Sequence, residues 1–322
     1  MVMEEAEAAA PAAFGGFPAE VRPGATRVGW VGIGVMGGAM AARLLAAGYA
    51  VTAYARAPAK AAPLVAAGAR LADSPASAAA ASDVVFTMVG NPGDVRAVVL
   101  DAATGALAGL RRGGVLVDCT SSSPALAREV AAAARAAGSH AVDAPVSGGD
   151  VGARDGTLAV LAGGDEAVVT WLAPLFAHLG KLNYMGPPGS GQSSKIANQI
   201  TVAGAVVGLG ESLAFAGAAG LDTRLFLGAV AKGAAGSRVM DLFGERALSR
   251  DFATGGSVRY IIKDLGMALE VGDGQEEEVG ANVLPGAALF RQMFSAMAAN
   301  GDGDLCLQGL ITVVERLNGI RK

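Results

Sequence analysis

The sequence is poor in the residues that build disulfide frameworks and metal centres. Its 322 residues include two cysteines, Cys119 and Cys306, and two histidines, His140 and His178. Neither cysteine belongs to a CxxC or Cys/His spacing, and no HExxH-type pair occurs. We therefore expect buried free thiols in a reducing compartment, structural histidines and no metal site.

Charge and long apolar runs are also scarce. The chain carries 25 Lys and Arg against 29 Asp and Glu, and it lacks the basic excess that a nucleic-acid partner requires. The longest uncharged stretches, 28–42 and 196–210, have 15 residues each, fewer than the roughly 18–20 of a membrane span. Charged residues make up 17%, below the roughly 25% of typical soluble domains. We therefore expect neither nucleic acid nor membrane as a partner, and burial of surface within a homodimer or homotetramer.

The first 26 residues contain four acidic residues and one arginine, without an apolar run. A secretory peptide needs a basic start and an apolar segment, and a mitochondrial transit peptide is rich in arginine and poor in acids. We therefore expect residues 1–26 to be a disordered extension of a cytoplasmic protein.

Short apolar runs alternate with helical patterns in the first part of the chain. The run 27–31 precedes a helical pattern at 36–47, and the run 83–89 has the character of a buried strand. Such alternation predicts βαβ units and a mostly parallel, doubly wound sheet. The fold class is therefore α/β, with the sheet domain over residues 27–187.

The pattern changes after Tyr184. A long helical segment runs from Ser193 to about Ala219, and no strand alternation follows it. We expect residues 188–322 to form a second, all-helical domain for substrate binding and oligomerisation.

A G-x-G-x-x-G sequence directly follows the first predicted strand and opens the first predicted helix. In this context one glycine allows a tight turn, the second lets backbone approach a pyrophosphate, and the third allows close helix–strand packing. The amides and dipole of the helix N-terminus bind the phosphates. A tight turn without a ligand is the weaker interpretation. We predict a Rossmann domain that binds a dinucleotide at Gly32, Ile33, Gly34, Val35, Met36 and Gly37.

The end of the second predicted strand bears on the choice of nicotinamide cofactor. NAD-binding domains place Asp or Glu there to bind the ribose, whereas this sequence reads Tyr54-Ala55-Arg56 and has no acid before Asp73. An arginine suits the 2′-phosphate of NADP, and Lys60 adds charge one helical turn later. We expect NADP(H), with NAD(H) less favoured; the alternative is that Arg56 is a solvated surface residue.

Five stretches together resemble the β-hydroxyacid dehydrogenase family, which includes 3-hydroxyisobutyrate dehydrogenase, tartronate semialdehyde reductase and glyoxylate/succinic semialdehyde reductases. They occur in the family's order between residue 28 and about residue 270. They are the cofactor loop Val31–Met40, the nicotinamide-side loop Asp118–Pro124, the substrate signature Asp143–Gly149, the catalytic helix Gly189–Gln199 and the motif Lys263-Asp264-Leu265.

The resemblance implies an NADP(H)-dependent oxidoreductase with its active site between the two domains. The substrate would be a small aldehyde or 2-oxo acid with a carboxylate, or the corresponding hydroxyacid. The resemblance also implies that Lys263 lies near the cofactor, although spacing alone makes Lys263-Asp264 an ordinary solvated pair. The residues implied to line the nicotinamide side are Met88, Val89, Gly90 and Ser121.

Lys195 fits the role of proton donor. Carbonyl reduction by hydride makes an alkoxide, which needs a proton donor or a cation beside the oxygen. A lysine on the first turns of a buried helix supplies both, and burial lowers its pKa toward a useful range. Asn198 and Gln199 project from the same helix face, and much of the family has Asn at the second position, so which amide orients the substrate or lysine stays open. The alternative is a snorkelling surface lysine.

Ser147-Gly148-Gly149 follows a predicted strand and a proline. Consecutive glycine-flanked amides form an anion-binding concavity, and the serine hydroxyl adds a donor. We expect this turn to bind the substrate carboxylate; the alternative is a plain strand-ending turn.

Two other functions remain as rivals. Decarboxylating 6-phosphogluconate dehydrogenase shares these motifs but has a much longer helical domain. A non-catalytic NAD(P)-binding module is the rival from another class, and relatives of that kind lose the lysine that stands here at Lys195.

Overall fold

The computed structural model describes residues 20–253, 256–272 and 283–320. The chain forms two compact units, unit 1 over residues 1–193 and unit 2 over residues 194–322, so the expected boundary at 187 lies six residues too early. The expected disorder of residues 1–26 is wrong for residues 20–26, because Val21 and Thr26 are buried. The remainder of that segment, 1–19, lies outside the described residues.

Unit 1 is built on a nine-stranded sheet with the order β3-β2-β1-β4-β5-β6-β8-β7, in which β9 also pairs with β8. The run from β3 to β6 is parallel, and β8 is antiparallel to β6 and β7. This confirms the mostly parallel α/β fold. The strands are β1 (Arg27–Val31), β2 (Ala50–Tyr54), β3 (Arg70–Leu71), β4 (Val84–Thr87), β5 (Val115–Asp118), β6 (His140–Asp143), β7 (Val146–Ser147), β8 (Leu158–Gly163) and β9 (Gly180–Gly186).

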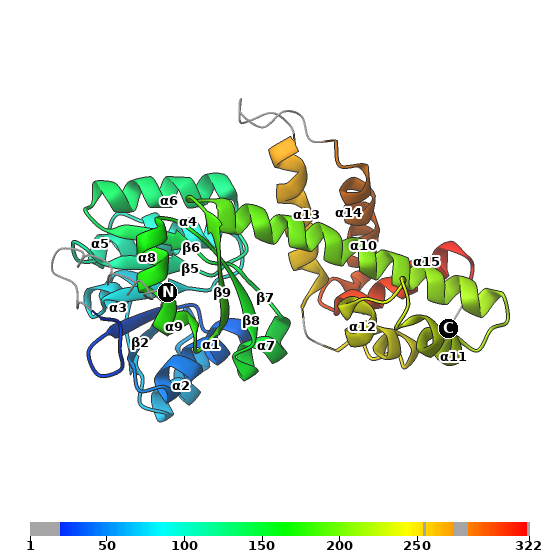
Figure 1. The fold of residues 1–322 in the computed structure, drawn as a ribbon, viewed down its shortest axis with the longest axis horizontal. Coiled ribbons are helices and arrows are strands. Elements are labelled where there is room, and N and C mark those ends of the chain that lie inside the picture. Colours follow the sequence, from blue (N-terminus) through cyan, green and yellow to red (C-terminus); the bar gives the residue numbers. More distant parts are fainter. Residues whose placement is uncertain (1–19, 254–255, 273–282, 321–322) are drawn as a thin grey trace, which may run out of the picture. The chain divides into compact units, whose positions relative to one another are not determined.

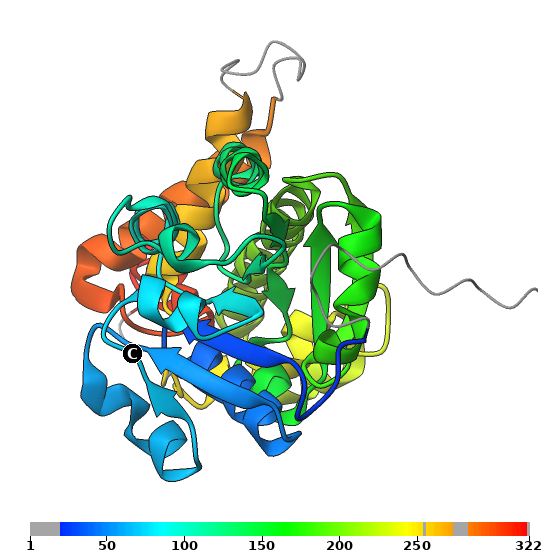
Figure 2. The same cartoon turned by 90° about the vertical axis from the view of Figure 1, so that its left-hand side faces the viewer.

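Helices cover both faces of this sheet (Figures 1 and 2). Successive side chains of each buried strand point to opposite faces, so both faces are apolar and both must be covered. On one face Trp30 stacks on Phe86, with ring centroids 5.1 Å apart, while Val31 and Val85 pack on the other. The helices are α1 (Val35–Ala46), η1 (Pro58–Ala61), α2 (Ala62–Ala66), α3 (Pro75–Ala80), α4 (Pro92–Leu100), α5 (Ala106–Gly109), α6 (Pro124–Ala136), α7 (Gly149–Asp155), α8 (Glu166–Trp171) and α9 (Ala173–Phe176).

In its described residues unit 2 consists of helices joined by turns and loops, with an isolated β-bridge between Ser257 and Cys306. Its longest helix, α10 (Ser190–Ala218), begins within unit 1, and Val206 packs with Ile261, Leu265 and Phe294 in the core of unit 2. The other helices are α11 (Thr223–Val230), α12 (Arg238–Leu248), α13 (Val258–Gly272), α14 (Pro285–Met297), the π-helical turn η2 (Ala298–Asp302), η3 (Leu307–Leu310) and α15 (Ile311–Leu317).

By length and composition, α10 is the one described helix that is apolar enough to cross a membrane. The absence of a membrane partner therefore stays a prediction. Core helices of globular domains meet the same criterion, and buried residues of α10 do pack in unit 2.

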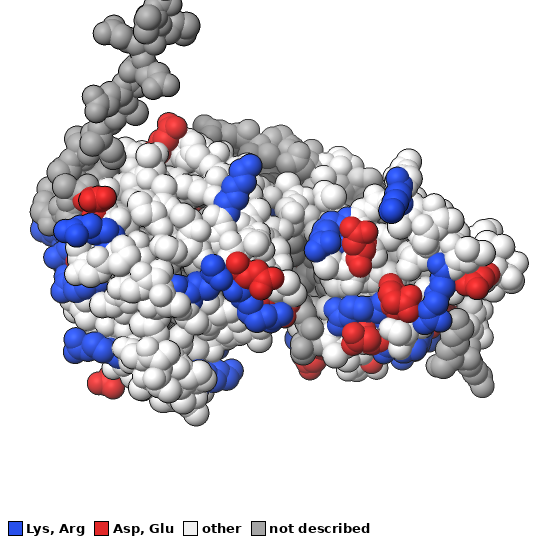
Figure 3. Space-filling model, turned by 60° about the horizontal axis from the view of Figure 1, so that its bottom comes forward, with Lys and Arg blue, Asp and Glu red and all other residues white. Residues whose placement is uncertain are grey.

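Charges of opposite sign mix on the molecular face that Figure 3 shows. Lysine and arginine lie interspersed with aspartate and glutamate, and broad uncharged areas separate them. This face therefore has the low charge density that the composition indicates.

Candidate functional site

The glycine loop between β1 and α1 has the steric properties expected of a dinucleotide loop. Gly32 has a φ of 101°, and a Cβ there would lie 2.2 Å from the Met88 carbonyl oxygen. A Cβ on Gly37 would lie 2.1 Å from the Gly32 oxygen, which explains the third glycine. Gly34 is the N-cap of α1, and a Cβ there would meet nothing within 4 Å. Open space above the first-turn amides of α1 therefore fits a pyrophosphate.

The side chains between these glycines divide by environment. Ile33 is buried in the core, Met36 is half-buried, and Val35 is 73% exposed at the first turn of α1. An exposed valine beside open space leaves the helix N-terminus accessible to a ligand.

Arg56 follows β2 and is largely exposed, as a group that binds a ligand phosphate must be. Its Nη1 lies 3.2 Å from Asp94 Oδ1, in an ion pair whose side chains are 78% and 22% exposed. Lys60 in η1 is also exposed. An exposed ion pair of this kind contributes little to stability, so the Arg56 guanidinium can leave Asp94 for another anion at small cost in free energy.

The ends of β4 and β5 bring several expected cofactor residues to one sheet edge. The Val89 amide donates to Thr120 Oγ1 at 3.0 Å, and the Thr87 hydroxyl donates to Asp118 Oδ1 at 2.7 Å. The loops that contain Met88, Val89, Gly90 and Ser121 are thereby joined at the carboxyl ends of neighbouring parallel strands. Open α/β sheets bind their ligands at this edge.

The Ser147 turn requires its glycines. Gly148 and Gly149 have φ values of 134° and 65°, which L side chains rarely adopt. Gly149 also has open space where a Cβ would stand. The half-buried Ser147 ends β7 directly before Gly148. The turn thus leaves room for an anion beside its backbone.

Two residues that the sequence analysis did not assign hold the first turn of α10 within unit 1. Buried Asp143 accepts from the Gly189 and Gln192 amides at 2.8 and 2.9 Å. Desolvation raises the pKa of Asp143 to about 7, against the lowering effect of those bonds. Gln192 donates to the Thr120 carbonyl and accepts from the Ser122 amide. Both lie in the motifs quoted above, but no pattern in the sequence indicates that they meet across 46 to 49 residues.

Unit 2 contains a buried polar cluster around Lys195, which is 9% exposed. Lys195 Nζ donates to Gln199 Oε1 at 2.9 Å, and Asn198 Nδ2 donates to the same oxygen at 2.9 Å. Gln199 Nε2 donates to Asp264 Oδ2 at 2.7 Å. Of the two amides left open by the sequence, Gln199 is therefore the one that receives the lysine.

Burial lowers the pKa of Lys195 to about 8; the Asp264 carboxylate opposes this shift and the Lys263 ammonium adds to it. Lys263 Nζ lies 3.1 Å from Asp264 Oδ1, with side chains 18% and 3% exposed. The interpretation of Lys263-Asp264 as a solvated pair is therefore wrong, because packing of α13 buries Asp264 and leaves Lys263 only partly exposed. A buried lysine with this pKa can give or take a proton near neutral pH.

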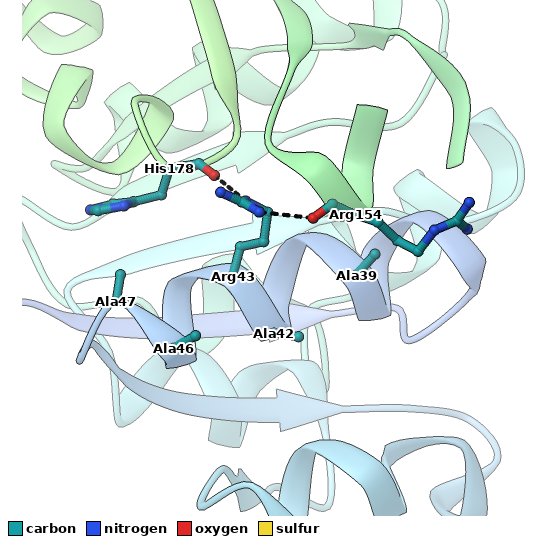
Figure 4. A pocket seen from close by; sticks show the side chains of 7 residues that line it. All are labelled: Ala39, Ala42, Arg43, Ala46, Ala47, Arg154 and His178. Carbon is teal, nitrogen blue, oxygen red and sulfur yellow. Dashed lines mark hydrogen bonds between the residues drawn. The ribbon is translucent and has the colours of Figure 1, made fainter. Parts of the chain in front are cut away.

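A hollow of about 490 Å³ on unit 1 is lined by none of the expected site residues. Arg43 of α1 donates across it to the carbonyl oxygens of His178 and Arg154, at 2.6 and 2.8 Å (Figure 4). Arg43 thereby ties α1 to α7 and to the turn after α9. The lining residues are Ala39, Ala42, Arg43, Ala46, Ala47, Arg154 and His178.

Comparison with protein families matches both parts of the chain. The family described as the NAD binding domain of 6-phosphogluconate dehydrogenase matches residues 27–189. The family described as NAD-binding of NADP-dependent 3-hydroxyisobutyrate dehydrogenase matches residues 189–314.

Individual proteins resemble the chain over most of its length. Probable 3-hydroxyisobutyrate dehydrogenase-like 3, mitochondrial, of Arabidopsis thaliana is 53% identical over 94% of this chain and 92% of its own. The 2-hydroxy-3-oxopropionate reductase of Escherichia coli is 36% identical over 90% and 97%. The structure of Mycobacterium tuberculosis 3-hydroxyisobutyrate dehydrogenase with L-serine has a TM-score of 0.81, with 28% identity over 90% of this chain and 99% of that one.

Proposed function

Because the chain belongs to the β-hydroxyacid dehydrogenase family, we propose that it catalyses the reversible, NADP(H)-dependent reduction of a small aldehyde or 2-oxo acid that carries a carboxylate. The chain is an oxidoreductase of the NAD(P)-dependent hydroxyacid dehydrogenase type. Its buried Lys195, hydrogen-bonded to Gln199 and with a pKa of about 8, is the observation that carries the proposed chemistry.

The cofactor fits residues of unit 1. Gly32, Gly34 and Gly37 form the loop that would hold the pyrophosphate. A Cβ at Gly32 or Gly37 would clash with backbone atoms of the protein, so these glycines allow the tight turn, and the open space at Gly34 would take the ligand. Exposed Arg56 and Lys60 would hold the 2′-phosphate of NADP. Met88, Val89, Gly90 and Ser121 would line the nicotinamide side, and Lys263 would lie near the cofactor. When bound, the nicotinamide supplies the hydride.

Lys195 supplies the proton for the reduction. Its ammonium donates one proton to the oxygen of the substrate carbonyl as that oxygen gains negative charge, which leaves a neutral amine and an alcohol. In the reverse direction the neutral amine takes the hydroxyl proton. Gln199 Oε1 holds Nζ in place during both, since it accepts one of the lysine N–H groups.

The Ser147-Gly148-Gly149 turn binds the substrate carboxylate in this proposal. Its support is the pair of positive φ values, the open space at Gly149 and the serine hydroxyl. Asn198, which donates to Gln199 here, is the second polar contact proposed for the substrate.

The names of two relatives support our proposal of a short carboxylic acid as substrate. The E. coli protein is named for 2-hydroxy-3-oxopropionate, and the mycobacterial structure contains L-serine, a three-carbon hydroxyacid. We propose a substrate of this size, among glyoxylate, succinic semialdehyde, tartronate semialdehyde and methylmalonate semialdehyde.

The test follows NADPH absorbance with each of these four aldehydes, using wild type and Lys195→Ala. Turnover of at least one aldehyde by wild type, and its loss in the variant, supports the proposal. NADPH binding without turnover of any aldehyde would instead favour the rival, a non-catalytic NAD(P)-binding module.

We also propose a homodimer or homotetramer. Unit 2 exposes Phe215, Leu221 and Leu225 by 74%, 53% and 72% around the end of α10 and the start of α11, which is costly for apolar side chains in water. Light scattering at micromolar concentration should give two or four copies. Phe215→Glu should lower that number, and a monomeric wild type would contradict the proposal.

The other proposed partners and the compartment follow from the sequence. We propose a small-molecule substrate with no nucleic acid or membrane partner, and the cytoplasm as compartment. The Arabidopsis relative is named as mitochondrial, so that organelle is the second candidate. Imaging of a fluorescent fusion of the full chain in its own cell type distinguishes them.

A further inference from the structure

We propose that Asp264 is a positioning residue for Lys195: through Gln199 it fixes which end of the side-chain amide faces the lysine. The inference rests on the proposed role of Lys195 as proton donor and adds a residue to that site. Asp264 itself makes no direct contact with the lysine among the hydrogen bonds described; it acts through Gln199.

Apolar packing brings the two side chains together. Ile196 and Ile200 of α10 pack with Met267 and Ala268 of α13. This contact places Gln199 against Asp264, 65 residues later in the chain, at a donor–acceptor distance of 2.7 Å.

The chemistry of its neighbours leaves Gln199 one stable orientation. Lys195 and the Asn198 amide nitrogen are donors, and both point at Oε1, while ionised Asp264 only accepts and receives Nε2. A flipped amide would present its NH₂ group to the ammonium and its oxygen to the carboxylate. Both contacts would be repulsive, so the charge on Asp264 decides which atom Lys195 meets.

The environment of Asp264 supports a role beyond helix packing. The residue is 2% exposed, and burial of a carboxylate costs free energy that an apolar side chain would avoid. Oδ2 is committed to Gln199, whereas Oδ1 has only the ion pair with Lys263 and accepts no aligned hydrogen bond among the described residues. A buried carboxylate with one oxygen that accepts no hydrogen bond contributes little to stability, so a purely structural role explains this residue poorly.

The charges that act on Lys195 agree with this arrangement. Asp264 raises its pKa, whereas burial and Lys263, the other charged group of α13 that acts on it, lower it. Asp264 therefore both orients the acceptor of Lys195 and favours the protonated form needed for reduction.

The experiment compares Asp264→Asn, Gln199→Met and the double variant. Competitive acetylation of Lys195 with acetic anhydride, followed by mass spectrometry across pH, gives the lysine pKa without any substrate. The kcat for the best aldehyde and the Kd for NADPH are measured in parallel. We expect each single variant to lower the Lys195 pKa and to lower kcat by about tenfold or more at neutral pH, with unchanged NADPH binding.

The losses in the double variant, compared with those in the single variants, distinguish a positioning role of Asp264 from a purely structural one. If Asp264 acts through Gln199, the double variant loses little more than either single variant. Glu315→Gln is the matched control, since Glu315 is also a buried carboxylate of unit 2, paired with Arg250 at 2.7 Å. This control should lower thermal stability and leave the Lys195 pKa and kcat unchanged.

Two results would overturn the inference: an unchanged Lys195 pKa in Asp264→Asn, or additive losses in the double variant. If Asp264→Asn does not fold, Gln199→Met still decides, because it breaks the bridge and keeps the buried ion pair. If wild type reduces none of the aldehydes, the proposed function fails, yet the acetylation profile still tests the link between Asp264 and Lys195.

Discussion

Lys195 and Gln199 lie one helical turn apart on α10, and Nζ of the lysine donates to Oε1 of the glutamine at 2.9 Å. The i,i+4 spacing places both side chains on one helix face. Burial of Lys195, and not its sequence spacing from Gln199, lowers the lysine pKa to about 8. The lysine can then exchange a proton at the pH of a cell.

Replacement of Lys195 should remove the proton donor and leave the cofactor domain intact. We expect Lys195→Ala to lower kcat about 10²- to 10⁴-fold, the usual contribution of general acid catalysis, with little change in NADPH Kd. Lys195→Arg should stay impaired, because an arginine does not release its proton near neutral pH. Lys181→Ala, at an exposed lysine of β9, is the control. Wild-type turnover in Lys195→Ala would refute the assignment.

The open space at Gly34 should be ligand space. A Cβ there meets no protein atom within 4 Å, so we expect Gly34→Ala to keep its Tm while its NADPH affinity drops. Gly37→Ala should instead lower the Tm, since its Cβ would lie 2.1 Å from the Gly32 oxygen. Thermal melts and NADPH titration check both. Unaltered NADPH binding by Gly34→Ala would mean that the loop does not hold the pyrophosphate.

Arg56 should determine the preference for NADPH. The loss of one charge-assisted contact to the 2′-phosphate is worth roughly 1.5–3 kcal/mol, or about 10- to 150-fold in affinity. NADH has no such phosphate, so Arg56→Ala should leave its affinity nearly unchanged. Asp94→Asn should keep or raise NADPH affinity, because it removes the carboxylate that pairs with Arg56.

The measurement for Arg56 is the ratio of kcat/KM with NADPH to that with NADH, in wild type and variants. Arg96→Ala, at a surface arginine paired with Glu129, is the control and should not change the ratio. A wild-type ratio below one, or a ratio that Arg56→Ala does not alter, would show that Arg56 is a solvated surface residue.

Local steric rules made the cofactor loop predictable. The roles of Gly32, Gly34 and Gly37 follow from how close a strand, a turn and a helix must approach each other, and the structure has those contacts. Alternating strands and helices likewise predicted the parallel sheet. Strands β3 and β9 were missed, because neither contains a buried residue and neither therefore has the apolar run that marks the other strands.

The polar partners of the site depend on tertiary packing and were not predictable. Asp264 meets Gln199 only because α10 packs on α13, and Asp143 meets Gly189 across 46 residues of sequence. Val21 packs into the core of unit 1, although its flanking composition is that of a disordered tail. Composition and spacing describe neighbours along the chain, and these contacts join distant segments.

The pH dependence of kcat/KM in both directions tests the central claim most directly. With Lys195 at a pKa of about 8, its ammonium is the main form below that pH and its amine above it. Aldehyde reduction needs the ammonium, so its kcat/KM should fall above about pH 8, whereas hydroxyacid oxidation needs the amine and should rise through the same range. Profiles that move together, or that show no inflection near pH 8, would contradict Lys195 as the group that carries the proton.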